Sequence, residues 1–389
     1  MTGGNTLSFD ALVTLAERDS GAFGLADAGL LGRVGQLIDW INERGPYTRD
    51  EVRAMQHQIR RLLANRLRML LDRKRYPQIA EEKIDRPIFI VGFPRAGTTL
   101  IHSLLAEDPD VLAPQSWHMF SPSPPPGATQ VAAERIAHAQ RMIEDWMDFC
   151  PQQKPMHPYI DKGAFQLCED EEVGALDFRN TYCYHFYRIP TMSHHLMLDP
   201  DPVGAFAFHR EFLQHMQWNT GKTRWACKGP SHQGNLDGLF AAHPDALCVW
   251  PHRPMGEMFH SFIALSAAIY DAITGEPCDR KAFAEMLADG LSQGFNAMLG
   301  NDLIDDPRIM HLPFRDITAD PVAVVHRIYA RQDREVTPEF ENRVRAWLDA
   351  PENAVDRYGR YPYSYDDLGF DREWVEDLFA RYSQRFGLI

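Results

Sequence analysis

The chain has 389 residues, enough for one large α/β domain with a helical addition or for two to three domains, and its hydrophobic fraction of 44% supports a sizeable core. Its formal net charge of −14 argues against nucleic acid or an anionic membrane surface as the principal partner. No stretch has the pattern of a signal peptide or the length of a membrane-spanning helix, so we expect a cytoplasmic protein without integral membrane association. The six cysteines form no C-x-x-C pair and indicate reduced, structural thiols.

The first 84 residues are predicted to be helical. Helical periodicity runs through residues 8–20, 28–44 and 49–74. It is clearest in the third segment, where apolar side chains recur every three or four residues: Ile59, Leu62, Leu63, Leu67, Leu70 and Leu71. Such a stripe is typical of a packing face. We therefore expect a helical N-terminal region over residues 1–84, followed by an α/β domain over residues 85–389.

Residues 87–105 carry the strongest functional pattern in the chain. Ile88 to Val91 predict a buried strand, a turn rich in glycine and proline follows, and apolar periodicity from Leu100 predicts a helix. A strand, a loop and a helix in this order point successive backbone N–H groups at one anion. The segment therefore predicts a phosphate-binding loop.

This loop differs from the Walker A loop of nucleoside triphosphatases. Gly92 and Gly97 have the Walker spacing, but Thr98 stands where the Walker lysine would be, and Arg95 supplies a cation inside the loop. A triphosphate held with Mg²⁺ is therefore disfavoured. A less charged phosphate donor, bound without metal, fits better.

Two further segments supply cations at the ends of predicted strands. Residues 246–250 predict a strand that leads to Arg253, and Ser261 follows eight residues later in a helical run. Lys228 ends another short predicted strand. In a chain of net negative charge, these cations and Arg95 would have to attract an anionic nucleotide.

The remaining segments predict helices around the sheet, with a proline-rich stretch at 113–127 and an irregular, aromatic-rich stretch at 151–205. We expect residues 113–205 to form a loop and helical insert over the acceptor pocket. Further helices are predicted at 128–149, 206–219, 232–242, 255–269, 280–299, 321–331, 338–349 and 371–386, and a strand at 309–313.

The order of these motifs resembles the PAPS-dependent sulfotransferase family (PAPS is 3′-phosphoadenosine-5′-phosphosulfate), and in particular its bacterial branch. The resemblance runs from about residue 85 to the C-terminus. Four segments carry it: Pro94-Arg95-Ala96-Gly97-Thr98-Thr99, Lys228-Gly229-Pro230-Ser231-His232, His252-Arg253-Pro254-Met255 and Ala319-Asp320-Pro321.

The resemblance implies a P-loop-like central parallel sheet flanked by helices, PAPS as co-substrate and no metal. It also implies that the loop residues Arg95, Ala96, Gly97, Thr98 and Thr99 bind the 5′-phosphosulfate. Arg253 and Ser261 would hold the 3′-phosphate, and Lys228 would neutralise the bridging oxygen while Arg95 clamps the transferred group.

Three candidates remain for the general base that an alcohol or amine acceptor needs. His232 follows Lys228 by four residues. His118 occupies a position where relatives of this branch usually carry glutamate, which is the clearest departure from the family pattern. The acidic run Glu169–Glu172 is the third candidate, although such a run is more often a solvated face.

The sequence leaves the acceptor open. An aromatic and methionine-rich insert favours a small apolar acceptor with a hydroxyl group, such as a phenol, a sterol or a lipid. Homo-oligomerisation is also left open. A zinc site is rejected, because the pair His194-His195 has no further ligands at zinc spacing. Two alternatives to a sulfotransferase remain open: a P-loop kinase or nucleotide hydrolase, and a catalytically inactive sulfotransferase-like binding protein.

Overall fold

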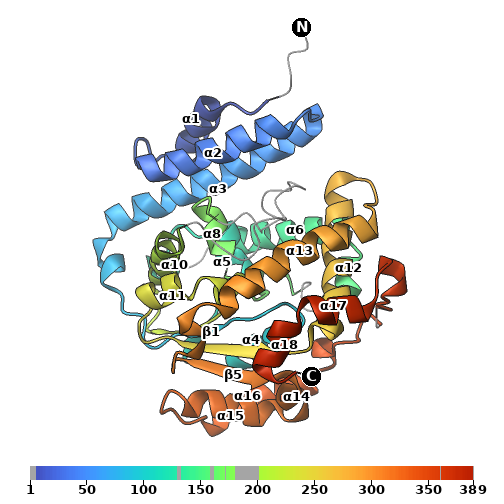
Figure 1. Ribbon diagram of the computed structural model, residues 1–389. Helices are drawn as coiled ribbons and strands as arrows, with labels where there is room; N and C mark the ends of the chain where they lie inside the picture. The colour runs from blue at the N-terminus through green and yellow to red at the C-terminus, as the bar shows by residue number, and fades with distance from the viewer. Residues whose placement is uncertain are drawn as a thin grey trace.

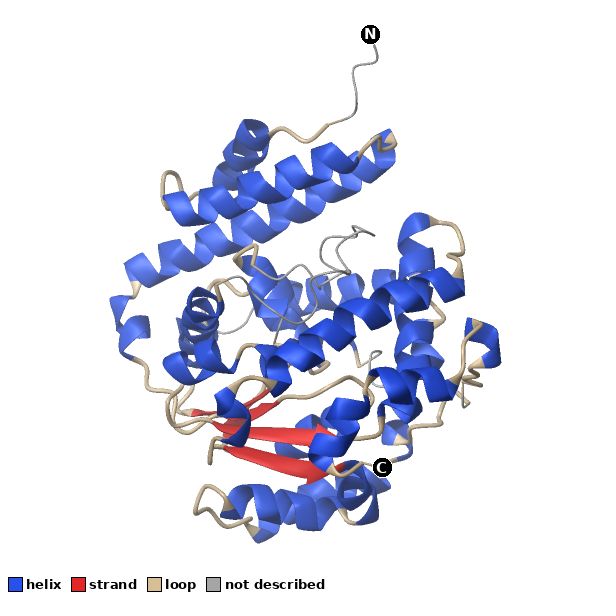
Figure 2. Cartoon of the chain, viewed as in Figure 1, coloured by secondary structure: helices blue, strands red, loops and turns tan. Residues whose placement is uncertain are grey.

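The protein is described from a computed structural model that covers residues 6–128, 133–157, 162–170, 172–179, 201–359 and 361–388. Its centre is a parallel five-stranded sheet with the strand order β2-β3-β1-β4-β5 (Figures 1 and 2). The strands are β1 (Ile88–Ile90), β2 (Val111–Leu112), β3 (Arg224–Lys228), β4 (Leu247–His252) and β5 (Ile309–Pro313). The predicted α/β class with a central parallel sheet is confirmed.

The strands form because their residues are buried on both faces of the sheet. Neighbouring residues of β1 belong to different parts of the core: Phe89 packs with Cys248 on one face, whereas Ile88 and Ile90 pack with Val249 on the other. This alternation follows from the two-residue period of a strand. Continuous apolar runs are what a parallel sheet covered by helices on both sides requires.

Helices cover both faces of the sheet (Figure 1). The apolar cluster that contains Ile88 and Val249 includes side chains of α4 (Thr98–Leu105), α14 (Phe314–Ala319), α15 (Pro321–Ala330) and α16 (Pro338–Asp349). The opposite cluster includes side chains of α10 (Pro202–Gln217), α11 (Leu236–Ala242), α12 (Met255–Thr274), α13 (Arg280–Leu299), α17 (Arg372–Leu378) and α18 (Ala380–Phe386).

The N-terminal helices α1 (Phe9–Ser20), α2 (Ala28–Arg44) and α3 (Arg49–Arg75) form the layer farthest from the sheet (Figure 1). A capping box between Thr48 and Glu51 starts α3. The layer is joined to the rest of the chain by Asp177, whose side chain is only 2% exposed. Its carboxylate accepts from Arg33 at 2.5 Å, Arg66 at 2.9 Å and Arg179 at 2.8 Å.

Short helices occupy the segment predicted as an insert. They are α5 (Ser116–Phe120), α6 (Ala133–Phe149), α7 (Gln153–Met156) and α8 (Glu172–Leu176). Residues 129–132, 158–161, 171 and 180–200 of the insert lie outside the described residues, and with them His194 and His195. The boundary between residues 84 and 85 and the role of residues 113–205 stay predictions.

Several elements have bounds other than those expected. Strand β4 continues beyond the predicted end at residue 250, through Pro251 and His252. This is possible because N–H groups alternate sides along a strand, and the missing N–H of Pro251 falls on the side of β1, which has already ended at Ile90. The predicted C-terminal helix 371–386 is two helices that meet at Phe379. No helix within the described residues is long and apolar enough to cross a membrane.

Candidate active site

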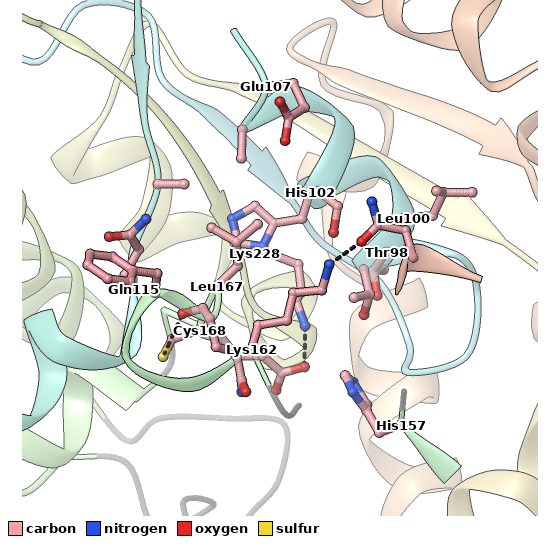
Figure 3. Close-up of a pocket in the computed structure, with 18 of the residues that line it drawn as sticks. Thr98, Leu100, His102, Glu107, Gln115, His157, Lys162, Leu167, Cys168 and Lys228 are labelled. Carbon is pink, nitrogen blue, oxygen red and sulfur yellow. Dashed lines mark hydrogen bonds and ion pairs between the residues drawn. The ribbon is translucent and has the colours of Figure 1, made fainter. Parts of the chain in front are cut away.

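A cavity of about 1070 Å³ lies beyond the carboxyl ends of the central strands (Figure 3). It is lined by the loop after β1, by Lys228 at the end of β3, by Arg253 after β4 and by Phe314 after β5. In open α/β sheets, ligands bind at this edge, where the strand order changes direction around a central strand. The volume is large enough for a nucleotide together with a small acceptor.

The loop between β1 and α4 curls back on itself through three residues with positive φ: Gly92 at 120°, Arg95 at 76° and Gly97 at 92°. Glycine is required at both ends. A Cβ on Gly92 would lie 3.0 Å from the Trp250 ring, and one on Gly97 would lie 3.2 Å from the Phe314 ring. Gly97 is also the N-cap of α4, so the loop ends at free helical N–H groups, which favour an anion.

Both predicted arginines, Arg95 in the loop and Arg253 after β4, line this cavity and are linked by a hydrogen bond. Arg253 donates from Nη1 to the carbonyl oxygen of Arg95 at 3.1 Å, and its guanidinium lies 4.3 Å from the centre of the Phe314 ring. Arg95 donates from Nη1 to the carbonyl oxygen of Met156 at 2.9 Å. The guanidinium of Arg253 is therefore held against the loop backbone at Arg95, although 158 residues separate the two.

Lys228 forms the closest ion pair of the cavity. Its side chain is 4% exposed, and Nζ donates to Oε1 of Glu169, which is more exposed at 29% (Figure 3). Both residues line the cavity. A buried ammonium is tolerated there because the carboxylate compensates its charge.

The other predicted nucleotide-binding residues are divided between cavity and core. Gly97, Thr98 and Thr99 line the cavity, with Thr98 largely buried. Ala96 is fully buried and Ser261 is 5% exposed, and neither is among the described residues that line the cavity. The hydroxyl of Ser261 donates to the carbonyl oxygen of Met258 at 2.9 Å.

His118 lines the cavity from α5, but a nitrogen of its ring takes part in a structural hydrogen bond. Nδ1 accepts from the backbone N–H of Gln115 at 3.1 Å as part of a capping box. Burial, with a smaller contribution from the nearby Arg135, lowers the pKa of His118 to about 3. The ring is therefore neutral and weakly basic at physiological pH.

His232 lies in a buried cluster that sequence reasoning did not foresee. Its Nε2 lies 2.9 Å from Oδ1 of Asp170, and Nε2 of His209 lies 2.7 Å from Oδ2 of the same carboxylate. All three side chains are buried, and none is among the described residues that line the cavity. Of the acidic run, Glu169 and Glu172 line the cavity, Asp170 faces this cluster and Glu171 lies outside the described residues.

Part of the cavity lining is apolar. Trp117, Phe262, Leu265 and Ile269 line the cavity together with a few polar groups from other elements, among them Gln115, Gln153 and His157. His157 went unrecognised in the sequence as a site residue. Burial first, and then the charges of Lys228 and Arg95, lower its pKa to about 4, so it lies in the field of both predicted catalytic cations. The only available signal was its place in an aromatic-rich stretch.

A phosphate-binding type of loop without the Walker lysine, with two half-buried arginines beside it, defines a P-loop-like anion site, and comparisons identify the family. A model of the sulfotransferase family matches residues 87–338, more than half of the chain, and the protein belongs to that family. The family predicted from the motifs is thus confirmed. Enzymes of this family transfer a sulfuryl group to small-molecule acceptors and generally take it from PAPS.

Two solved structures share the architecture across almost the whole chain. Sulfotransferase STF9 from Mycobacterium avium superposes with a TM-score of 0.82 at 22% identity, covering 100% of this chain and 98% of that one. Sulfotransferase STF1 from Mycobacterium tuberculosis H37Rv gives a TM-score of 0.74 at 22% identity, covering 97% and 99%. At such identity the likeness establishes the fold. Among curated proteins, no match was found.

Proposed function

We propose that this sulfotransferase uses PAPS and transfers its sulfuryl group, without a metal ion, to a hydroxyl or amine of a small, largely apolar acceptor. The observation that carries the proposal is the meeting of Arg95, Arg253 and Lys228 at one cavity with the helix N-terminus of the phosphate-binding loop. A sulfuryl group bears less negative charge than a terminal phosphoryl group. Fixed cations and N–H groups can therefore supply the stabilisation that Mg²⁺ gives a kinase.

In this proposal the donor lies along the loop. The N–H groups at Gly97, Thr98 and Thr99 and the hydroxyl groups of the two threonines bind the 5′-phosphosulfate, and Arg95 clamps the equatorial oxygens. Lys228 approaches the bridging oxygen and neutralises the charge that develops as the sulfur–oxygen bond breaks. Arg253, with Ser261 as its predicted partner, binds the 3′-phosphate.

The acceptor attacks the sulfur in line, from the side opposite the leaving phosphate. Its proton must pass to a base, and the placement of the three candidates favours Glu169. Glu169 lines the cavity beside Lys228, whereas His118 is held by Gln115 with a pKa of about 3, and His232 is turned to Asp170. When Lys228 moves to the donor, the carboxylate of Glu169 is released to accept the proton.

The donor is tested by ligand-induced stabilisation. The desulfonated product PAP should raise the melting temperature in the presence of EDTA, and ATP should do so much less, because a ligand stabilises the state it binds. An acceptor screen with labelled PAPS, read by mass spectrometry, then tests for turnover of phenols, sterols and aliphatic alcohols. A shift by PAP that EDTA abolishes would overturn the metal-free proposal, and PAP binding without any transfer would favour the inactive alternative.

A further inference from the structure

The buried cluster of Asp170, His209 and His232 joins three segments of the chain behind the catalytic ion pair. Asp170 precedes α8, His209 belongs to α10 and His232 lies in the turn after β3. Both carboxylate oxygens of Asp170 accept from imidazole Nε2 atoms, at 2.7 and 2.9 Å. Because each oxygen has its own donor, the side chain is fixed in orientation as well as in place.

Each member of the ion pair is directly attached to this cluster. Glu169 precedes Asp170 in the chain, and the backbone N–H of Asp170 donates to the carbonyl oxygen of Lys228 at 2.9 Å. The next residue, Gly229, donates to the carbonyl oxygen of Ile90 at the end of β1. A Cβ on Gly229 would come within 2.5 Å of the His232 ring, so ring and backbone are closely packed.

We propose that Asp170, His209 and His232 act as positioning residues, which hold Glu169 and Lys228 at the distance and orientation that sulfuryl transfer requires. The inference rests on the roles proposed above for Lys228 and Glu169. It assigns His232 to a place behind the catalytic groups, in contact with Asp170 instead of the acceptor.

The charge of the cluster supports this assignment. Burial alone would raise the pKa of the Asp170 carboxyl, but the two histidines outweigh burial and hold it well below its usual range. Nδ1 of His209 finds no hydrogen-bond partner among the described residues, so the printed hydrogen bond of this ring is the one from Nε2 to Asp170. A buried carboxylate is costly unless its bonds are made, so losing one donor would free Asp170 to move.

The same three groups also have the composition of a metal site, since their ligand atoms lie within 4.8 Å of one another. In the structure, however, each Nε2 lies at hydrogen-bond distance from the carboxylate, which accounts for the whole cluster. A resident metal ion is therefore the rival explanation that the experiment must separate.

The test compares variants that keep or weaken the hydrogen bonds of the cluster. His232→Leu and Asp170→Asn should lower kcat about tenfold or more, as loss of supporting bonds does elsewhere, and should leave the KM for PAPS and the Kd for PAP within about twofold. His232→Gln retains an N–H donor and should keep most of kcat. The matched control is His243→Leu, because His243 is buried, its ring lies 5.7 Å from that of His209 and no hydrogen bond joins it to Asp170 among those described. Its kcat should stay near normal.

The outcomes separate this inference from the proposed function. If Lys228→Ala keeps normal turnover, the proposed mechanism itself fails. If Lys228→Ala is inactive while His232→Leu is normal, or if His232→Gln falls as far as His232→Leu, the positioning inference is wrong. If His243→Leu lowers kcat equally, the loss in His232→Leu comes from disturbed core packing and the positioning inference is wrong. Stoichiometric metal in the purified protein, with kcat lost on chelation, would make the cluster a metal site.

Discussion

The two ends of the cavity are built in different ways. The phosphate-binding loop at the donor end is one continuous segment, residues 92–99, whose shape is set by local backbone angles at Gly92 and Gly97. The rest of the lining is assembled from α5, α7, α12 and residues 162–169, which meet only in the folded chain and in part contact the loop. Anion binding by the loop therefore depends on local geometry, whereas acceptor recognition depends on tertiary packing. The predictions below test this contrast.

The largest effect is expected from the cations at the donor end. Arg95→Ala and Lys228→Ala should each lower kcat about a hundredfold or more, because each removes a preorganised charge that opposes the charge of the transition state. Single-turnover transfer from labelled PAPS measures the step directly. Lys222→Ala is the control, since Lys222 lines the same cavity from the turn before β3. Similar losses in all three variants would contradict a role specific to the donor.

The base lies where the two ends meet. With an aliphatic alcohol as acceptor, Glu169→Gln should lower kcat about a hundredfold, as expected for loss of a general base. His118→Gln should change mainly the KM for the acceptor, because its ring is held by Gln115 and a pKa of about 3 makes it a poor base. An aliphatic acceptor is needed because a phenol requires little help. A large kcat loss in His118→Gln with normal turnover in Glu169→Gln would show that His118 is the general base.

Arg253 tests whether the donor end has a second, non-reacting anion site. Arg253→Ala should weaken PAP about tenfold and leave kcat almost unchanged, because the 3′-phosphate takes no part in the reaction. Calorimetric titration with PAP and with adenosine 5′-phosphosulfate, which lacks the 3′-phosphate, separates the two sites. Ser261→Ala should have the smaller effect, since its hydroxyl is already bonded to Met258. If Arg253→Ala weakens both ligands equally, Arg253 does not recognise the 3′-phosphate.

The smallest effect concerns stability and does not depend on the site. His215 is a fully buried residue of α10, and burial lowers its pKa to about 3, opposed by its bond to the carbonyl oxygen of Pro122. Between that value and the ordinary value of about 6.5, the unfolded chain binds a proton that the folded chain does not. This histidine therefore destabilises the folded state by about 1.4 kcal/mol for each pH unit lost in that window.

Urea unfolding from pH 7 to pH 5 measures the slope. The free energy of unfolding should fall on acidification in the wild type, and it should fall less steeply in His215→Gln, which carries no titratable group at that position. Parallel slopes would show that His215 is protonated in the folded protein as readily as in the unfolded one.

The sequence was informative where function is local. It indicated the sheet, the loop at 92–99, and the placement of Arg95, Lys228 and Arg253 at strand ends, because strand and loop patterns need only neighbouring residues. It did not indicate that Glu169 would pair with Lys228 across 59 residues, nor that Asp170 would turn away from its neighbour to meet two histidines. A run of acidic residues in a sequence does not indicate which of their side chains faces the cavity. His118 likewise looked available in the sequence, but its capping bond and its burial are tertiary properties.

The ion pairs between Asp177 and three arginines indicate which truncated forms of the protein would stay folded. The family match begins at residue 87, yet Arg33 and Arg66 reach Asp177 from helices that precede it. A chain that begins at residue 85 would lose two of the three arginines that pair with the Asp177 carboxylate and keep Arg179 alone. It would also expose the faces that α3 covers. The residue range that matches the family model is therefore shorter than the range that a stable protein needs. Truncated forms for crystallisation or engineering should retain α2 and α3.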